Sequence, residues 1–163
     1  MVSKRLSREA GHKRKFLAIV DNTPECERAI SYAARRAHST NGSVVLLFAV
    51  EPGDFQHWLG VEQIMRDEQL AAAQAVLDAQ ATRIRTTIGI EPELVLREGK
   101  MVDQIGALIE EDQDIAILVL GAGNSKEGPG PLVSSIAGKA ATFPIPVTVV
   151  PNSLSDEEIE SLA

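Results

Sequence analysis

The most informative part of the chain reads Ile115-Ala-Ile-Leu-Val-Leu-Gly121-Ala-Gly123-Asn124. It continues through a loop rich in glycine and proline to Ser134-Ser135, and then to a second apolar run that ends in Val147-Thr-Val-Val150. A continuous apolar run closed by glycines predicts a strand that is buried on both faces. The loop leads to the expected start of a helix at Ser134, where free backbone N–H groups favour an anion such as phosphate.

Strands and helices are predicted to alternate along the whole chain. Apolar runs predict strands at residues 16–20, 43–50, 94–96 and 147–150, in addition to the one that starts at Ile115. Helical spacing of apolar residues predicts a helix that begins at Thr23-Pro24, helices over 61–87, 101–111 and 134–142, and a short last helix after Ser155. This pattern is typical of an α/β protein with an open, Rossmann-like, five-stranded parallel sheet that has helices on both faces.

Three segments of the chain differ in composition. Residues 1–15 carry six basic residues and only one acidic residue, Glu9, which predicts a basic, disordered leader. Residues 16–151 contain all the predicted strands and form the expected α/β domain, and residues 152–163 form an acidic tail. The leader could contact nucleic acid or an acidic partner, but a solvated tail is the simpler interpretation.

The overall composition excludes several classes of protein. The net charge is −7, and because the leader is basic the remaining chain is more acidic still, which disfavours binding to nucleic acid. No apolar run is long enough to span a bilayer, so no membrane role is predicted. The single cysteine, Cys26, excludes an intramolecular disulfide and fits a reducing, cytoplasmic setting.

A ligand site is expected where the winding of the sheet reverses. For the strand order 3-2-1-4-5, the reversal falls between the first and fourth strands, which end at Asp21 and Gly121. Asp21 can accept hydrogen bonds from a ribose hydroxyl or a base. The glycines at 121 and 123 permit close backbone approach and positive φ, and Asn124 tolerates a left-handed backbone. The same residues also fit a purely structural loop in which Ser134 only caps a helix.

Other site motifs are absent from the sequence. It has no phosphate-binding P-loop, no Gly-x-Gly-x-x-Gly after the first strand, and no paired carboxylates of a phospho-receiver. No Cys/His cluster has metal-ligand spacing, and no Ser/His/Asp site is indicated. We therefore predict no catalytic residue and no metal site. Cys26, in the first turn of the first helix, fits either a reactive thiol or a small buried side chain.

The chain resembles the universal stress protein family in three places. Residues 16–34 resemble the family's opening strand, aspartate, turn and alanine-rich helix. Residues 44–50 with Glu51-Pro52 resemble its second strand, and the third place runs from Leu118 through Ser134-Ser-Ile136 to Val150. The resemblance covers residues 16–151 and implies a fold similar to that of the adenine nucleotide alpha hydrolases, together with a role in stress response or signalling.

The resemblance also implies a binding site for ATP or another adenine nucleotide, with Mg²⁺ accompanying it. ATP-binding members carry Gly, two residues, Gly, nine residues, and then Gly-Ser or Gly-Thr. In that register this chain has Gly121, Asn124 and Ser134-Ser135, so two of the three glycines are replaced. By resemblance, the base and ribose would be held by Asp21 and the backbone of Val50, and the phosphates by Gly121, Asn124, Ser134 and Ser135.

The family usually dimerises through its last strand, which implies a homodimer interface formed by Val147, Thr148, Val149 and Val150. Pro146 and Pro151, which bracket this strand, also fit protection of an exposed edge in a monomer. The replaced glycines motivate an alternative function, a protein-interaction module of the same fold that binds no nucleotide and has an unknown protein partner. An ATPase is the weaker alternative, because the sequence names no general base.

Overall fold

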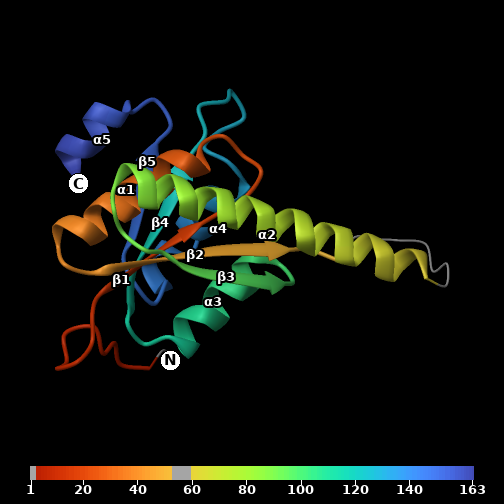
Figure 1. Ribbon diagram of the computed structural model, residues 1–163. Coiled ribbons are helices and arrows are strands. Elements are labelled where there is room, and N and C mark those ends of the chain that lie inside the picture. Colours follow the sequence, from red (N-terminus) through yellow and green to blue (C-terminus); the bar gives the residue numbers. More distant parts are fainter. Residues whose placement is uncertain (1–2, 53–59) are drawn as a thin grey trace.

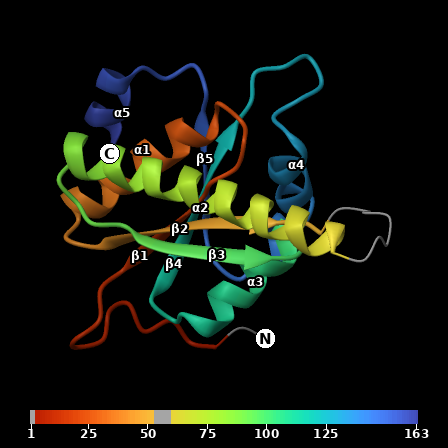
Figure 2. The same cartoon turned by 45° about the vertical axis from the view of Figure 1, so that its right-hand side comes forward.

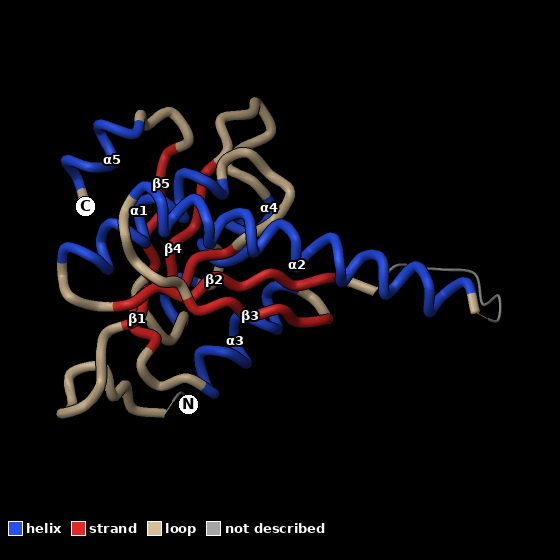
Figure 3. The backbone as a smooth tube through the Cα atoms, in the orientation of Figure 1, coloured by secondary structure: helices blue, strands red, loops and turns tan. Residues whose placement is uncertain are grey.

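A computed structural model describes residues 3–52 and 60–163 of the protein. Its five parallel strands form one sheet in the order β3-β2-β1-β4-β5, as predicted (Figures 1 and 3). The strands are β1 (Lys15–Ile19), β2 (Ser43–Val50), β3 (Glu93–Glu98), β4 (Ile115–Ala122) and β5 (Val147–Pro151). The carboxyl ends of β1 and β4 lie next to each other, which is where the winding reverses.

Helices cover both faces of the sheet (Figure 2). The helices are α1 (Cys26–Ser39), α2 (Val61–Thr87), α3 (Met101–Glu111), α4 (Pro131–Ala137) and α5 (Asp156–Leu162), with one 3-10 turn, η1 (Ala140–Thr142). The last helix starts as predicted, because the Ser155 hydroxyl accepts a hydrogen bond from the Glu158 N–H at 3.1 Å. Of these helices, none is both long enough and apolar enough to cross a bilayer.

Successive strand residues point to opposite faces of the sheet and so divide the core in two. Phe16 and Ala18 pack on the face covered by α1 and α2. Leu17 and Ile19 pack on the face covered by α3 and α4. All four side chains are buried, which explains why the strand reads as a continuous apolar run rather than an alternating one.

The alanine-rich face of α1 packs directly on the sheet. Ala29, Ala33, Ala34 and Ala37 are all buried against β1, β2 and β4. Small side chains let this helix lie close to the strands, so the residues that follow β1 are also held close to the end of β4.

Two helix starts differ from the prediction. The first helix begins at Cys26 and not at Thr23-Pro24, because the Asp21 carboxylate bonds to the Thr23 N–H and holds a turn ahead of the helix. The fourth helix begins at Pro131 and not at Ser134. Proline is favoured in the first helical position because its φ is fixed and it has no N–H to leave unpaired.

The N-terminal segment, which the sequence predicts to be disordered, lies against the C-terminal end of α3. The Arg5 guanidinium donates to the carbonyl oxygens of Ile109, Asp112 and Ile115 at 2.6, 3.2 and 3.2 Å. Ile109 lies in the last turn of α3 and Asp112 directly follows the helix, where backbone carbonyls lack helical partners, whereas Ile115 begins β4. The basic residue therefore caps α3 from a distant part of the chain.

Candidate functional site

Asp21 lies at the carboxyl edge of the sheet, directly after β1. Its Oδ1 atom accepts hydrogen bonds from both the backbone N–H and the hydroxyl of Thr23, the first at 2.8 Å. Both bonds use the same oxygen, so among the described residues Oδ1 is the atom that Thr23 holds. The side chain is half-buried, so it is both fixed and accessible.

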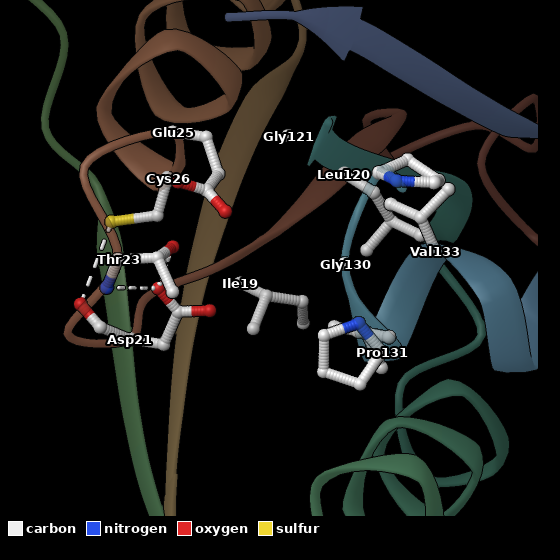
Figure 4. A pocket seen from close by; sticks show the side chains of 12 residues that line it. Ile19, Asp21, Thr23, Glu25, Cys26, Leu120, Gly121, Gly130, Pro131 and Val133 are labelled. Carbon is white, nitrogen blue, oxygen red and sulfur yellow. Dashed lines mark hydrogen bonds between the residues drawn. The ribbon is translucent and has the colours of Figure 1, made fainter. Parts of the chain in front are cut away.

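Two pockets lie on either side of the Asp21-Asn22 turn. The crevice pocket, between the ends of β1 and β4, has an empty volume of about 440 Å³ (Figure 4). Its lining includes Asp21, Thr23, Glu25, Cys26, Gly121, Gly130 and Pro131. The base-side pocket, between the end of β2 and helix α2, has an empty volume of about 610 Å³, and its lining is formed by Asn22, Phe48, Ala49, Val50, Glu51, Gln69, Ala72, Ala73 and Val76.

Glu25 fills the space beside Gly121 in β4 and Gly123 just after the strand. A Cβ added to Gly121 would lie 2.3 Å from the Glu25 carbonyl oxygen, and one added to Gly123 would lie 2.9 Å from its carboxylate Oε1. These glycines therefore allow Glu25, the N-cap residue of α1, to approach the end of β4 closely. The sequence indicates that Gly121, Gly123 and Asn124 can adopt positive φ, but none of the three adopts it in the structure. Positive φ occurs further along the same loop, in Gly128 and Gly130.

The backbone N–H groups expected to bind phosphate are already used in the loop. The Gly123 N–H donates to the Pro129 carbonyl at 2.9 Å, and the Ser134 N–H donates to the Gly130 carbonyl at 3.0 Å. Because α4 begins at Pro131, Ser134 and Ser135 lie one turn inside the helix and are exposed. The prediction that they start the helix is therefore wrong.

The crevice pocket is lined by carboxylates and lacks a compensating charge. Asp21 and Glu25 both border it, and of the described residues in its lining none is a lysine or an arginine. Two carboxylates facing one small pocket disfavour a polyanion there. Sequence reasoning missed Glu25, because its contact with β4 depends on how closely α1 packs on the sheet.

Cys26 is a neutral, buried thiol. Burial is the largest cause that raises the pKa of this side chain, to about 11, and the S–H donates a weak hydrogen bond to the Asp21 carbonyl at 3.5 Å. The thiol is thus protonated at neutral pH and is not an activated nucleophile. Of the two interpretations of Cys26, the structure supports the small buried side chain.

A profile of the universal stress protein family matches residues 13–151. The chain belongs to the universal stress protein family. No curated protein matches it by sequence. Among solved structures, the universal stress protein UspA from Lactobacillus plantarum is similar with 19% identity and a TM-score of 0.70, over 84% of this chain and 97% of that one.

Two further similar structures of universal stress proteins hold nucleotides. One, described as a complex with cAMP, has 19% identity and a TM-score of 0.62 over 86% of this chain and 98% of that chain. The other, from Archaeoglobus fulgidus in complex with dAMP, has 21% identity and a TM-score of 0.59 over 84% and 97%. At these identities the similarity establishes the shared fold.

The structure divides the predicted site residues of this universal stress protein into separate groups. Asp21 and Gly121 line the crevice pocket, and Val50 lines the base-side pocket. The Val50 carbonyl accepts a hydrogen bond from the Gly99 N–H at 2.9 Å, which ties the end of β2 to the end of β3. The described residues that line these two pockets do not include the other predicted site residues, Gly123, Asn124, Ser134 and Ser135.

The last strand is an edge strand that pairs with β4 within the described residues. Val149 is 44% exposed, whereas Val150 is 2% exposed and belongs to the core. In the predicted dimer interface, the exposed Val149 side chain could contact a partner, whereas the buried Val150 side chain could not. The outer backbone edge of β5 extends along the whole strand.

Proposed function

We propose that this universal stress protein is a stress-response or signalling module that binds an adenine nucleotide with a short phosphate chain. One observation supports the proposal above the others. The Asp21-Asn22 turn, at the point where the sheet reverses, borders both a pocket without basic groups and a larger pocket with a mainly apolar lining. A nucleoside offers the matching pair of groups, a flat base and a hydroxylated sugar.

The base-side pocket suits an aromatic heterocycle. The side chains of Phe48, Ala72 and Val76 provide apolar surface, and the amides of Asn22 and Gln69 provide donors and acceptors. Small-molecule sites usually combine an apolar lining with a few polar groups in this way. In the proposal the backbone of Val50 also borders the base.

The ribose would be held by Asp21. Its Oδ1 is already fixed by Thr23, so Oδ2 has a defined orientation without a ligand. A carboxylate accepts hydrogen bonds from hydroxyl groups more strongly than a neutral acceptor does. This preorganisation lowers the entropy cost of binding the sugar.

We propose a ligand with a short phosphate chain because of the residues that follow Asp21 in the crevice pocket. Glu25 adds a second carboxylate, and the Gly123 N–H is bonded to Pro129. In the proposal one phosphate borders Gly121, while Gly123, Asn124, Ser134 and Ser135 take no part and Mg²⁺ is not required. The similar structures described with cAMP and dAMP carry ligands with a single phosphate, which supports this class of ligand.

Calorimetric titration with adenosine and AMP tests the proposal. Asp21→Asn keeps an oxygen acceptor for the Thr23 turn but removes the charge, so we expect about a tenfold loss of adenosine affinity with an unchanged fold. Asp67 is an exposed carboxylate on α2 that lines neither pocket, so Asp67→Asn is the matched control. Absence of heat with either ligand in the native protein would contradict the proposal.

The second candidate function is a homodimeric protein-interaction module without a nucleotide. It is favoured by the loop in which Gly123 and Ser134 already have backbone partners, and by the exposed edge of β5. Pairing of two such edges would extend the sheet. Val149→Asp should shift the protein from dimer to monomer in sedimentation experiments, and an unchanged sedimentation coefficient would contradict pairing through β5.

We also propose a cytoplasmic location, which the single buried cysteine supports. An ATPase remains the weaker alternative. Within residues 3–52 and 60–163, no group of three or more His, Cys, Asp or Glu side chains is arranged to hold a metal ion.

A further inference from the structure

A third pocket lies between the outer sides of α1 and α5 and the last turns of α2, away from the crevice pocket. Its empty volume is about 640 Å³. Figure 2 shows α5 beside α1 and the end of α2. The lining consists of Glu27, Arg28, Ser31, Arg35, Arg83, Thr87, Ile88, Asp156 and Ile159, and we call it the arginine pocket.

Arg83 brings a partly buried positive charge into this pocket without a carboxylate partner. Its guanidinium donates to the Ser31 hydroxyl at 2.7 Å, to the Gln80 side-chain oxygen at 3.0 Å and to the Glu27 backbone carbonyl at 3.4 Å. All three acceptors are neutral. Burial, the largest cause, lowers the pKa of Arg83, and it outweighs the opposing attraction of the nearby Glu27 carboxylate.

Two further guanidinium groups come from α1. Arg28 forms an ion pair with Asp156 of α5 at 2.7 Å and donates to the Leu154 carbonyl at 3.3 Å. Arg35, two turns further along the same helix, is half-buried and has no ion-pair partner within the described part of the chain. Three helices therefore converge on one pocket, and two of them supply its cations.

The charges do not balance. Three guanidinium groups face two carboxylates, those of Glu27 and Asp156, which leaves an excess of positive charge in a protein whose net charge is −7. An excess cation that is partly removed from water gains from an anion that enters beside it. The planar guanidinium group matches the oxygens of a phosphate in particular, because it can donate two parallel hydrogen bonds.

We infer that the arginine pocket is a binding site for a phosphate-class oxyanion, formed by Arg28, Arg35 and Arg83. The Ser31 oxygen accepts from Arg83, so the hydroxyl hydrogen of Ser31 is available to the ligand. The ligand competes with Asp156 for Arg28. Binding at this site is therefore linked to the position of α5, whose Ile159 is fully buried under the same pocket.

Titration of the full-length protein with inorganic phosphate at low ionic strength tests the inference. We expect saturable heat below about 10 mM phosphate. Arg35→Gln should weaken binding by about tenfold or more, because a hydrogen bond between charged groups is lost. Arg36→Gln, which removes the same charge from the next position of α1 and lies outside the pocket, should not change the affinity.

A second pair of variants tests the competition with α5. Asp156→Asn removes the internal anion from Arg28 and should strengthen phosphate binding severalfold, whereas Glu157→Gln, its neighbour outside the pocket, should leave it unchanged. Both variants and Arg35→Gln leave the nucleotide pockets intact, so adenosine binding reports on the crevice independently. No saturable heat in the native protein, or equal losses in Arg35→Gln and Arg36→Gln, would overturn the inference.

Discussion

The two pockets that share the Asp21-Asn22 turn differ in charge and in how fully the chain itself occupies them. The base-side pocket has a mainly apolar lining with two amides, Asn22 and Gln69, and one carboxylate, Glu51, and its volume is about 610 Å³. The crevice pocket is smaller, at about 440 Å³, and is bordered by the carboxylates of Asp21 and Glu25. In our proposal, the base-side pocket holds the base and the crevice pocket disfavours a chain of phosphates.

In this loop, which keeps the length of a phosphate-binding motif, Gly121 and Gly123 make close contacts within the fold. Gly121 lies where the family register predicts it, but the start of α1 takes up the room that its missing Cβ leaves. The glycine at position 121 therefore preserves a close contact between the start of α1 and β4, which the fold requires.

The largest effect is expected for Gly121→Ala. Its Cβ would lie 2.3 Å from the backbone carbonyl of Glu25, so the start of α1 or the end of β4 must move. We expect a loss of about 2–3 kcal/mol in the free energy of unfolding, measured by urea denaturation. Gly106→Ala, in an open position of α3, should instead stabilise the protein by about 1 kcal/mol.

Gly123→Ala sharpens the same comparison. Its Cβ would meet only the end of the Glu25 side chain, which can rotate away. This variant should cost less than about 1 kcal/mol. Equal destabilisation by Gly121→Ala and Gly123→Ala would mean that the contact between α1 and β4 is not what Gly121 protects.

The second-largest effect is expected on the base side. Ala72→Trp places a large ring in the base-side pocket from an exposed position of α2, so the fold should persist while adenosine affinity falls at least about tenfold. Ala71→Trp is the matched control, because its position is also exposed and does not line that pocket. If calorimetry gave the same adenosine affinity for both variants, the base would lie elsewhere.

The smallest effect is expected for the charge at the phosphate side. Glu25→Gln should raise ATP affinity about threefold to fivefold, because one repulsive charge of about 1 kcal/mol is removed in a partly exposed site. Asn124→Gly combined with Ser134→Gly should leave ATP affinity unchanged, since neither residue lines the crevice pocket. If ATP affinity rose in the Asn124→Gly/Ser134→Gly variant but not in Glu25→Gln, the glycines of the family motif, and not the Glu25 charge, would determine ATP binding.

Much of the fold could be predicted from local sequence. The strands are buried on both faces, so their residues form uninterrupted apolar runs, and the alanines of α1 recur at helical spacing. The start of α4 could also have been found, because Pro131 is a favoured first helical residue and Gly130 precedes it.

The remaining features depend on contacts between distant segments. Glu25 faces β4 only because α1 packs closely on the sheet. Arg83 joins Arg28 and Arg35 only because the end of α2 lies beside α1. The capping of α3 by Arg5 joins residues more than a hundred positions apart. Local periodicity predicts which elements form, but it carries no distance between side chains on different elements.

The ratio of AMP affinity to ATP affinity, measured by calorimetry on the native protein, tests the central claim most directly. A base side that accepts adenine and a phosphate side bordered by Glu25 together predict that AMP binds at least about tenfold more tightly than ATP. ATP binding as tight as AMP binding, or tighter, would contradict the account.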